Sequence, residues 1–141
     1  MSKVSVSIVL EEGVEIPTYA KEGDGCVDIK SNIDIIISPN TTVLIPTGIS
    51  MAIPEGYVGK LRGRSGLASK GIQINTGVID SGYRGELKVS VYNSTDRKVA
   101  FVKGDRIAQL EVQKRRFIQF NKVDTLESSN RGTNGFGSTG V

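Results

Sequence analysis

The sequence contains no histidine and only one cysteine, Cys26, among its 141 residues. The lack of histidine excludes Ser-His-Asp catalysis, Cys-His catalysis and any metal site with imidazole ligands. A single thiol cannot form an internal disulfide. Any chemistry therefore uses carboxylates, arginine, lysine, tyrosine or a bound metal ion.

Long apolar runs are also absent, because stretches such as Ile35-Ile36-Ile37 fall far short of a membrane span. Met1-Ser2-Lys3 leads into an alternating strand pattern and does not resemble a signal peptide. We therefore expect one soluble domain without membrane contact. Its expected location is intracellular, in the cytoplasm, or elsewhere in the host-cell interior, such as the nucleus, if the source is viral.

The net charge is only +3, but the charges are unevenly distributed along the chain. Residues 1–34 carry seven acids and three bases, whereas residues 60–116 carry thirteen bases and five acids. Such a cationic block is compatible with a solvated face, a nucleic-acid patch or a phosphate pocket. Composition alone favours the solvated face, and we expect no specific binding of nucleic acid.

Apolar residues alternate at Val4, Val6, Ile8 and Leu10, which is the period of a strand with one buried face. The same alternation recurs from Leu87 to Val91. Further short runs rich in β-branched residues predict strands at 33–37, 42–45, 49–53, 99–102, 107–112 and 117–120. Turn signals separate these runs at intervals typical of a β-sandwich or barrel, which predicts an all-β fold. The best helical candidate is Gly66–Lys70, with Ser65 as its N-cap.

From Ser128 onward the composition changes to glycine, serine, threonine and asparagine, with Phe136 and Val141 as the only apolar side chains. Ordering such residues costs about 1 to 2 kcal/mol each in backbone entropy, and they have little apolar surface to bury in return. We therefore divide the chain into a β domain, 1–127, and a flexible C-terminal arm, 128–141.

Five segments carry residues suited to chemistry. In the first, 23–29, Asp28 either faces a metal or caps a turn. The second, 63–71, combines Arg64, Ser65 and a helix start, which is equipment for binding phosphate. In the third, 75–86, Asp80 is the best candidate for a general base because histidine is absent.

Tyr83, in the same third segment, packs against a sugar or fills the core. The fourth segment, 104–110, is a turn entering a strand, with Gln109 as its one polar residue that points inward; Asp105 and Arg106 are interpreted as holding the turn. The fifth, 131–140, has neither Walker nor Rossmann spacing, although its glycines allow backbone amides to approach an anion.

Taken together and in this order, the five segments resemble the five motifs of the trimeric dUTP pyrophosphatases, or dUTPases. The most specific matches are Gly-Val-Ile-Asp-Ser-Gly-Tyr-Arg-Gly-Glu at 77–86, Gly-Asp-Arg-Ile-Ala-Gln-Leu at 104–110 and Arg-Gly-Thr-Asn-Gly-Phe-Gly-Ser-Thr-Gly at 131–140. The resemblance implies a jelly-roll-like β-barrel or sandwich, assembled as a homotrimer. Each C-terminal arm is expected to close over the site of a neighbouring subunit.

By the same resemblance, the chain hydrolyses dUTP to dUMP and pyrophosphate with Mg²⁺, which limits uracil incorporation into DNA and supplies dUMP for dTMP synthesis. Asp80 is expected to activate the water that attacks the α-phosphorus, Arg131 to act as an arginine finger, and Asp28 to hold Mg²⁺ through water. The expected substrate-binding residues are Arg64, Ser65, Gly66, Asn75, Gly77, Val78, Ile79, Tyr83, Lys88, Gln109, Arg131, Phe136, Gly137, Ser138 and Thr139.

The first and second motifs depart from the usual family pattern. The family usually reads Gly-Tyr-Asp-Leu where this chain has Cys26-Val27-Asp28-Ile29, so the aspartate is kept and its neighbours are not. The second motif opens with Gly63 instead of the usual proline. Cys26 is interpreted as a small core thiol and Lys114-Arg115-Arg116 as a solvated strand end.

Two alternatives remain open. The first is an enzyme related to dCTP deaminase, which has the same fold but a catalytic glutamate about ten residues beyond the third-motif aspartate, where this chain has Ser90. The second is a non-catalytic trimeric binding module, in which the cationic block contacts nucleic acid or protein.

Overall fold

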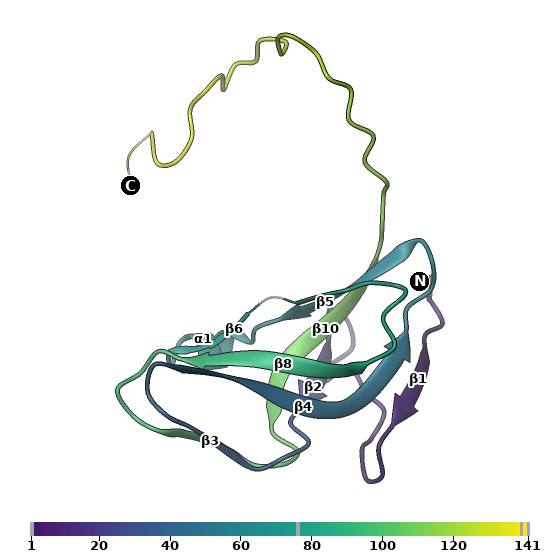
Figure 1. The fold of residues 1–141 in the computed structure, drawn as a ribbon, viewed down its shortest axis with the longest axis vertical. Coiled ribbons are helices and arrows are strands. Elements are labelled where there is room, and N and C mark those ends of the chain that lie inside the picture. Colours follow the sequence, from purple (N-terminus) through teal and green to yellow (C-terminus); the bar gives the residue numbers. More distant parts are fainter. Residues whose placement is uncertain (1, 76, 139, 141) are drawn as a thin grey trace.

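The described residues, 2–75, 77–138 and 140, form ten β-strands and one short α-helix in this computed structural model. The elements, labelled as in Figure 1, are β1 (Ser7–Leu10), β2 (Val27–Lys30), β3 (Ile35–Ile37), β4 (Thr41–Ala52), β5 (Tyr57–Arg62), α1 (Ser65–Ala68), β6 (Ile72–Ile74), β7 (Gly77–Ile79), β8 (Glu86–Asn93), β9 (Val99–Phe101) and β10 (Arg106–Lys114). The predicted all-β fold is therefore confirmed.

The strands pair antiparallel in three sheets (Figure 1). One four-stranded sheet has the order β1-β4-β8-β6, a second has the order β2-β10-β5-β7, and β3 pairs with β9. Neighbours in each sheet mostly lie far apart in the sequence, so the sheets join distant segments into one body. The second sheet brings β2, β5 and β10 side by side, which matters for the site below.

The core consists of the inward-facing aliphatic residues of the sheets. The long strands β4 and β8 contribute buried side chains at alternate positions, including Ile45, Val89 and Val91, as the period of two requires. Opposite residues come from the second sheet, among them Ile29 and Ile107. Each fully buried aliphatic side chain stabilises the fold by about 1.5 to 3 kcal/mol through removal of its apolar surface from water.

Several strand predictions are confirmed, and the differences have clear causes. The runs 42–45 and 49–53 belong to one strand, β4, which continues through a register irregularity between Pro46 and Ser50. Residues 117–120, all of them described, lie outside every strand and are exposed, so the strand predicted there is wrong within this single chain. In the part of the chain that the structure describes, these residues belong to none of the three sheets.

The predicted helix is correct in place but not in detail. The helix α1 begins at Ser65, and its N-cap is Arg64, whose extended backbone has φ −104° and ψ 136°. No side-chain hydrogen bond caps the helix, so the prediction that Ser65 is its N-cap is wrong. The hydroxyl of Ser65 is consequently not committed to capping this helix.

After β10 the chain leaves the body and curves away from it (Figure 1). Every described residue from Gln113 to Asn134 is exposed, and this stretch carries large apolar side chains at Phe117, Ile118, Phe120, Val123 and Leu126. Among the described residues, no helix is long and apolar enough to cross a bilayer.

Candidate active site

Four of the five predicted segments can be located on the folded body, and three of them meet at one cavity of about 320 Å³. We call it the Asp28 cavity. Its walls come from the loop before β2, from the residues around the start of α1 and from β10. The lining residues are Ala20, Asp24, Gly25, Cys26, Asp28, Arg64, Ser65, Gly66, Arg106 and Gln109.

The register of the second sheet explains why these segments meet. Gln109 of β10 pairs with Asp28 of β2 on one side and with Arg62 of β5 on the other. Directly paired residues of an antiparallel sheet project to the same face. The Gln109 amide nitrogen donates to the carbonyl of Gly63 at 2.7 Å, which fixes the backbone just before Arg64.

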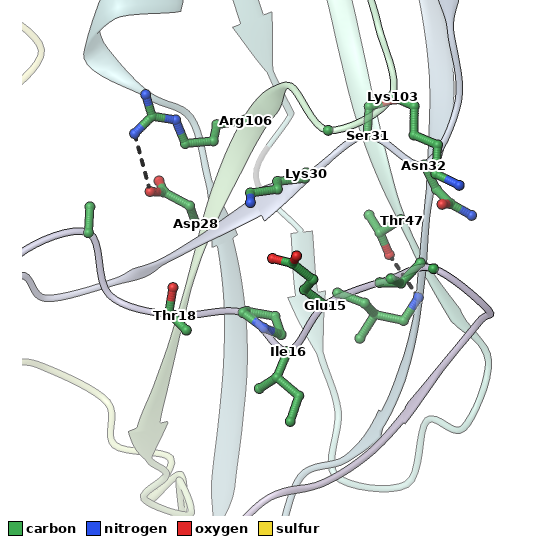
Figure 2. A pocket seen from close by; sticks show the side chains of 16 residues that line it. Glu15, Ile16, Thr18, Asp28, Lys30, Ser31, Asn32, Thr47, Lys103 and Arg106 are labelled. Atoms are coloured by element: carbon green, nitrogen blue, oxygen red, sulfur yellow. Dashed lines mark hydrogen bonds and ion pairs between the residues drawn. The ribbon is translucent and has the colours of Figure 1, made fainter.

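Asp28 lies between two guanidinium groups. Its Oδ1 is 3.8 Å from Nε of Arg64 and its Oδ2 is 3.7 Å from Nη1 of Arg106. Figure 2 shows Arg106 directed at Asp28 across the edge of the sheet. The carboxylate is 20% exposed, so the three charges interact close to the surface without being fully desolvated.

A larger cavity of about 620 Å³, shown in Figure 2, shares the lining residues Ala20, Asp28 and Arg106 with the first. It lies between the loop 13–18 and β2, and its charged lining residues are Glu15, Asp28, Lys30, Lys103 and Arg106. Asp28 and Arg106 line both cavities, so their ion pair lies where the two spaces meet. None of the sequence patterns predicts this second cavity.

The third segment forms a tight turn that connects β7 of the second sheet to β8 of the first; we call this turn the Tyr83 hairpin (residues 80–86), and β7 and β8 do not pair with each other. The amide of Tyr83 donates to the carbonyl of Asp80 at 3.1 Å, and the Tyr83 hydroxyl donates to the carbonyl of Glu86 at 2.9 Å. The ring lies against Gly85, where an added Cβ would come within 2.6 Å of Cζ of Tyr83. Tyr83 is therefore a half-exposed platform and not a core residue, and Asp80 is exposed beside it.

The hairpin is fixed to the body through β4. The amide of Gly48 donates to the carboxylate of Glu86 at 2.9 Å, and the buried Thr47 hydroxyl donates to the carbonyl of Leu87 at 2.7 Å. Gly48 has φ +71°, and a Cβ at this position would lie 2.7 Å from Val14. A side chain there would therefore disturb the anchor of the hairpin.

The Tyr83 hairpin and the Asp28 cavity lie apart within one chain. Ile79 pairs with Gly59, which places Asp80 beside Val58. Arg64 follows Val58 by six residues along an extended stretch, a separation of about 20 Å at about 3.3 Å per residue. One chain therefore assembles Asp28, Arg64, Ser65, Gly66 and Gln109, but it does not bring Asp80 to them.

The other predicted residues of the third segment are close to the hairpin or on the adjoining strands. Gly77, Val78 and Ile79 form β7, where Val78 is exposed and Ile79 is buried. The Asn75 amide donates to the Ser90 hydroxyl at 2.7 Å, and Lys88 is exposed on β8. Thr76, within the stretch expected to contact the base, lies outside the described residues.

The predicted residues of the arm are exposed. Nε of Arg131 donates to the carbonyl of Asn134 at 2.8 Å, and Phe136 is fully exposed with a left-handed φ of 50°. Gly137 and Ser138 follow in turns, and the Ser138 amide donates to the carbonyl of Gly135. Thr139 lies outside the described residues.

The few carboxylate oxygens near Asp28 suit a metal ion whose other ligands are water and substrate oxygens. Among the described residues there is no group of three or more acidic, cysteine or histidine side chains that could enclose an ion. The Asp28 cavity offers the carboxylates of Asp28 and Asp24. Mg²⁺ keeps several waters and takes substrate phosphates as ligands, so one carboxylate acting through water fits it.

Arg106 and Cys26 are among the lining residues of the Asp28 cavity that sequence reasoning does not assign to the site. The sequence pattern indicates a turn role for Arg106, yet this residue contacts Asp28. Cys26 is not the expected core thiol, because it is only partly buried and lines the cavity; burial, followed by the charge of Glu111, raises the pKa of this thiol. The strand β2, which positions Asp28, is too short and too mixed in composition to be predicted as a strand from the sequence.

Comparison with protein families gives a match to the dUTPase family over residues 12–140. The chain is 46% identical to the deoxyuridine 5'-triphosphate nucleotidohydrolase of Fusobacterium nucleatum, with 99% of each chain covered. It is 44% identical to the corresponding enzyme of Nocardia farcinica, over 93% of this chain and 82% of the relative.

Solved structures give the same result. A mutant dUTPase of Staphylococcus bacteriophage 80alpha, described with dUpNHpp, superposes with a TM-score of 0.86 at 30% identity, covering 99% of this chain and 100% of that one. A mutant dUTPase from phage phi11 of S. aureus superposes with a TM-score of 0.80 at 27% identity, covering 89% and 100%. That second structure is described as revealing the coordination of a structural Mg(II) ion.

Proposed function

The chain belongs to the dUTPase family and is a nucleotide hydrolase, and on this premise we propose that it converts dUTP to dUMP and pyrophosphate at sites shared between three subunits. The observation that carries the proposal is the meeting of Asp28, Arg64, Ser65 and Gln109 at one cavity in a chain so similar to named dUTP hydrolases. In a cell, this activity would limit uracil incorporation into DNA and supply dUMP for dTMP synthesis.

The Asp28 cavity binds the phosphate chain in this proposal. Arg64 gives it a positively charged phosphate-binding group, and the Ser65 hydroxyl and the Gln109 amide add neutral hydrogen-bonding groups. Charge-assisted hydrogen bonds from arginine to phosphate are about twice as strong as neutral ones. Gly66 lines the same wall.

The Tyr83 hairpin binds the nucleoside and activates water. Asp80 is exposed at the turn, so its carboxylate is accessible to a water molecule that it deprotonates for attack on the α-phosphorus. Tyr83 lies under the deoxyribose and crowds out a 2′-hydroxyl. The backbone around Asn75, Gly77, Val78 and Ile79 reads the uracil edge and leaves no room for a 5-methyl group, and Lys88 lies along the adjoining strand.

Separation of the hairpin from the cavity supports a site shared between subunits. A general base and its proton must come within about 2.6 to 3.2 Å, directly or through one water. The roughly 20 Å between Asp80 and Arg64 of one chain far exceeds that reach. In a homotrimer, the hairpin of one subunit lies against the Asp28 cavity of the next, and this arrangement generates three complete sites.

The arm, 128–141, closes each site from a neighbouring subunit. Arg131 acts on the γ-phosphate, and Phe136 covers the uracil ring, with backbone contacts from Gly137, Ser138 and Thr139. Base stacking on an aromatic ring contributes roughly 1 to 3 kcal/mol, which helps to offset the entropy cost of ordering the arm. Closure excludes bulk water from the reacting groups.

Asp28 would hold Mg²⁺, the proposed cofactor, through bound water. The ion would supply positive charge that neutralises and orients the phosphate oxygens. The protein residues do the remaining work: Arg64, Ser65 and Gln109 hold the phosphates, Asp80 removes a proton from water, and Arg131 stabilises charge that develops in the transition state.

A direct test is release of pyrophosphate from dUTP, dTTP, dCTP and UTP, each with and without Mg²⁺. We expect efficient turnover of dUTP alone, and only with the divalent cation. The alternative enzyme, related to dCTP deaminase, would produce uracil nucleotides from dCTP. It is disfavoured because Ser90 occupies the relevant position of β8 and its hydroxyl accepts a hydrogen bond from Asn75.

If the protein were instead a non-catalytic module that binds nucleic acid, its affinity for DNA would fall steeply with salt through counterion release, and no nucleotide would be consumed. Consumption of dUTP excludes this alternative. A strictly monomeric protein in light scattering would contradict the shared site.

A further inference from the structure

A β-bulge in β10 changes the direction of one arginine. Gln109 pairs with Asp28 and Ala108 with Ile29, but the next pair is Arg106 with Lys30, so Ile107 is an extra residue in β10. Ile107 and Ala108 are both fully buried, although neighbouring residues of a regular strand point to opposite faces. The bulge therefore moves Arg106 to the face that carries Asp28 and Gln109.

Without the extra residue, Arg106 would point to the opposite face, because it is three positions from Gln109. Bulges often lie next to active sites, where they redirect a side chain. The outcome here is the contact of 3.7 Å between Nη1 of Arg106 and Oδ2 of Asp28, seen in Figure 2. Arg64 contacts the other carboxylate oxygen, and its Nη1 also donates to the carbonyl of Arg106 at 3.1 Å.

The three side chains of Asp28, Arg64 and Arg106, which we call the Asp28 triad, are held loosely. Both ion pairs are longer than a hydrogen bond, and among the described residues no hydrogen bond to the Asp28 carboxylate is found. Arg106 is 51% exposed and lines both cavities, so its side chain has space to move without repacking the core. The arrangement combines a defined starting position with a low barrier to release.

We propose that Arg106 is a positioning residue for Asp28, which it holds and neutralises until a hydrated divalent cation arrives with the nucleotide and takes its place. The proposal rests on the proposed function, because it takes the Asp28 cavity as the phosphate site. With the triad intact, the net charge of its three side chains is +1, which suits an incoming triphosphate. When the cation arrives, its own charge takes over the neutralisation of Asp28 and the phosphates.

The consequence is a specific coupling between Arg106 and the cation. Loss of the Arg106 charge leaves Asp28 to repel the triphosphate when no divalent cation is present. A bound divalent cation compensates for that loss, so the variant depends more strongly on the cation than the native chain does. An arginine that touched the phosphates directly would instead contribute to affinity whether or not Asp28 were charged.

The experiment is calorimetric titration of the intact protein with dUpNHpp, once in excess Mg²⁺ and once in EDTA. The measured quantity is the ratio of Kd in EDTA to Kd in Mg²⁺. We expect Arg106→Gln to raise this ratio about tenfold relative to the native chain, which corresponds to about 1.4 kcal/mol of coupling. Arg106→Lys keeps the charge and is expected to restore most of the native ratio.

A matched control is Arg62→Gln. Arg62 projects from the same face of the same sheet and is similarly exposed, at 45%, but it pairs with Glu111 and does not line either cavity. Its substitution is expected to leave the ratio unchanged. An equal rise in the ratio for both variants would overturn the proposal, because the effect would then come from general positive charge.

The double variant Asp28→Asn/Arg106→Gln separates positioning from direct contact. If Arg106 acts through Asp28, the double variant has the same affinities as Asp28→Asn alone, with and without Mg²⁺. A further loss of affinity in the double variant under both conditions would overturn the proposal in favour of direct phosphate binding. Unchanged thermal unfolding of each variant establishes that the fold persists.

The proposed function and the positioning role of Arg106 predict different binding results. If the native protein does not bind dUpNHpp under either condition, the proposed function fails and the role of Arg106 fails with it. If the native protein binds the analogue with a clear dependence on Mg²⁺, but Arg106→Gln keeps the native ratio, only the role of Arg106 is overturned.

Discussion

The Asp28 cavity and the C-terminal segment after β10 differ in how their residues are ordered. The cavity is built on three hydrogen-bonded strands, which fix the backbone positions of its charged residues within the folded chain. The C-terminal segment leaves the body after β10 (Figure 1), is exposed almost throughout its described part and carries the exposed residues Arg131 and Phe136. In the proposed function, the cavity contributes charge that folding has already brought together, whereas the C-terminal segment contributes groups that become ordered only on binding.

The difference shows how the cost of order is distributed. Residues of the sheet are ordered during folding, and burial of the apolar core compensates for their loss of conformational entropy. In the proposed function, residues of the arm are ordered only when a ligand compensates for the loss of entropy, which would couple closure to the presence of substrate. Variants in the two regions should therefore affect different kinetic quantities.

Deletion of residues 128–141 should give the largest effect. The β domain should still fold and form a trimer, because the core lies entirely before Lys114. Hydrolysis of dUTP should fall by about 10³-fold or more, since loss of an arginine finger alone costs on the order of 10³ to 10⁵. Light scattering and pyrophosphate release measure the two outcomes, and Arg116→Ala serves as a control for positive charge on the same segment. Normal kinetics of the shortened chain would rule out a closing arm.

Asp80→Asn should give the next largest effect. Only the activation of water is removed, so binding of dUpNHpp and the trimer should persist while kcat falls by about 10²- to 10⁴-fold. The matched control is Asp96→Asn, because Asp96 is also an exposed aspartate next to β8. Retention of native kcat in Asp80→Asn would refute the general-base role.

Phe136→Ala should give a smaller loss, about 5- to 150-fold in kcat/KM, which corresponds to roughly 1 to 3 kcal/mol of stacking. Phe136→Tyr keeps an aromatic ring and should retain most of the native kcat/KM. Steady-state kinetics with dUTP compare the three proteins. Equal kcat/KM values for Phe136→Ala and the native protein would mean that the Phe136 ring does not cover the base.

Cys26 gives the smallest expected effect, in the cavity and not in the arm. Because burial raises the pKa of its thiol, the neutral form is favoured in the folded protein. The neutral thiol therefore contributes to the free energy of unfolding below the ordinary thiol pKa of about 8.5. This contribution is lost as the pH rises through the higher pKa that the thiol has in the folded protein. Reaction with iodoacetamide should therefore be slow at pH 7 and accelerate at a higher pH than for a free thiol. Reaction as fast as that of a free thiol at every pH would contradict this.

Much of the fold was predictable because it depends on local patterns. Alternating residues such as Leu87, Val89 and Val91 identified β8, and turn residues such as Lys103-Gly104-Asp105 identified the boundary before β10. The short strands β2, β6 and β7 were harder to predict, because three or four residues do not establish a period. The apolar residues 117–120 predicted a strand that does not form within the chain, since strand formation needs a partner edge.

The candidate site was predictable as a set of residue types but not as an arrangement. The order of Asp28, Arg64, Asp80, Gln109 and Arg131 along the chain was enough to indicate the family. Their spacing in the sequence did not indicate which of them lie together, since that depends on strand pairing between segments about eighty residues apart, such as those of Asp28 and Gln109.

The sequence by itself determined the chemistry available to this protein, because residue types and short motifs fix charge, nucleophiles and local backbone preference. Tertiary structure alone decided that Arg106 faces Asp28, since the bulge at Ile107 follows from how β10 pairs with β2 and not from any local pattern. Tertiary structure also separated Asp80 from Arg64 within one chain, because the register of β5 and β7 fixes their positions on the sheet.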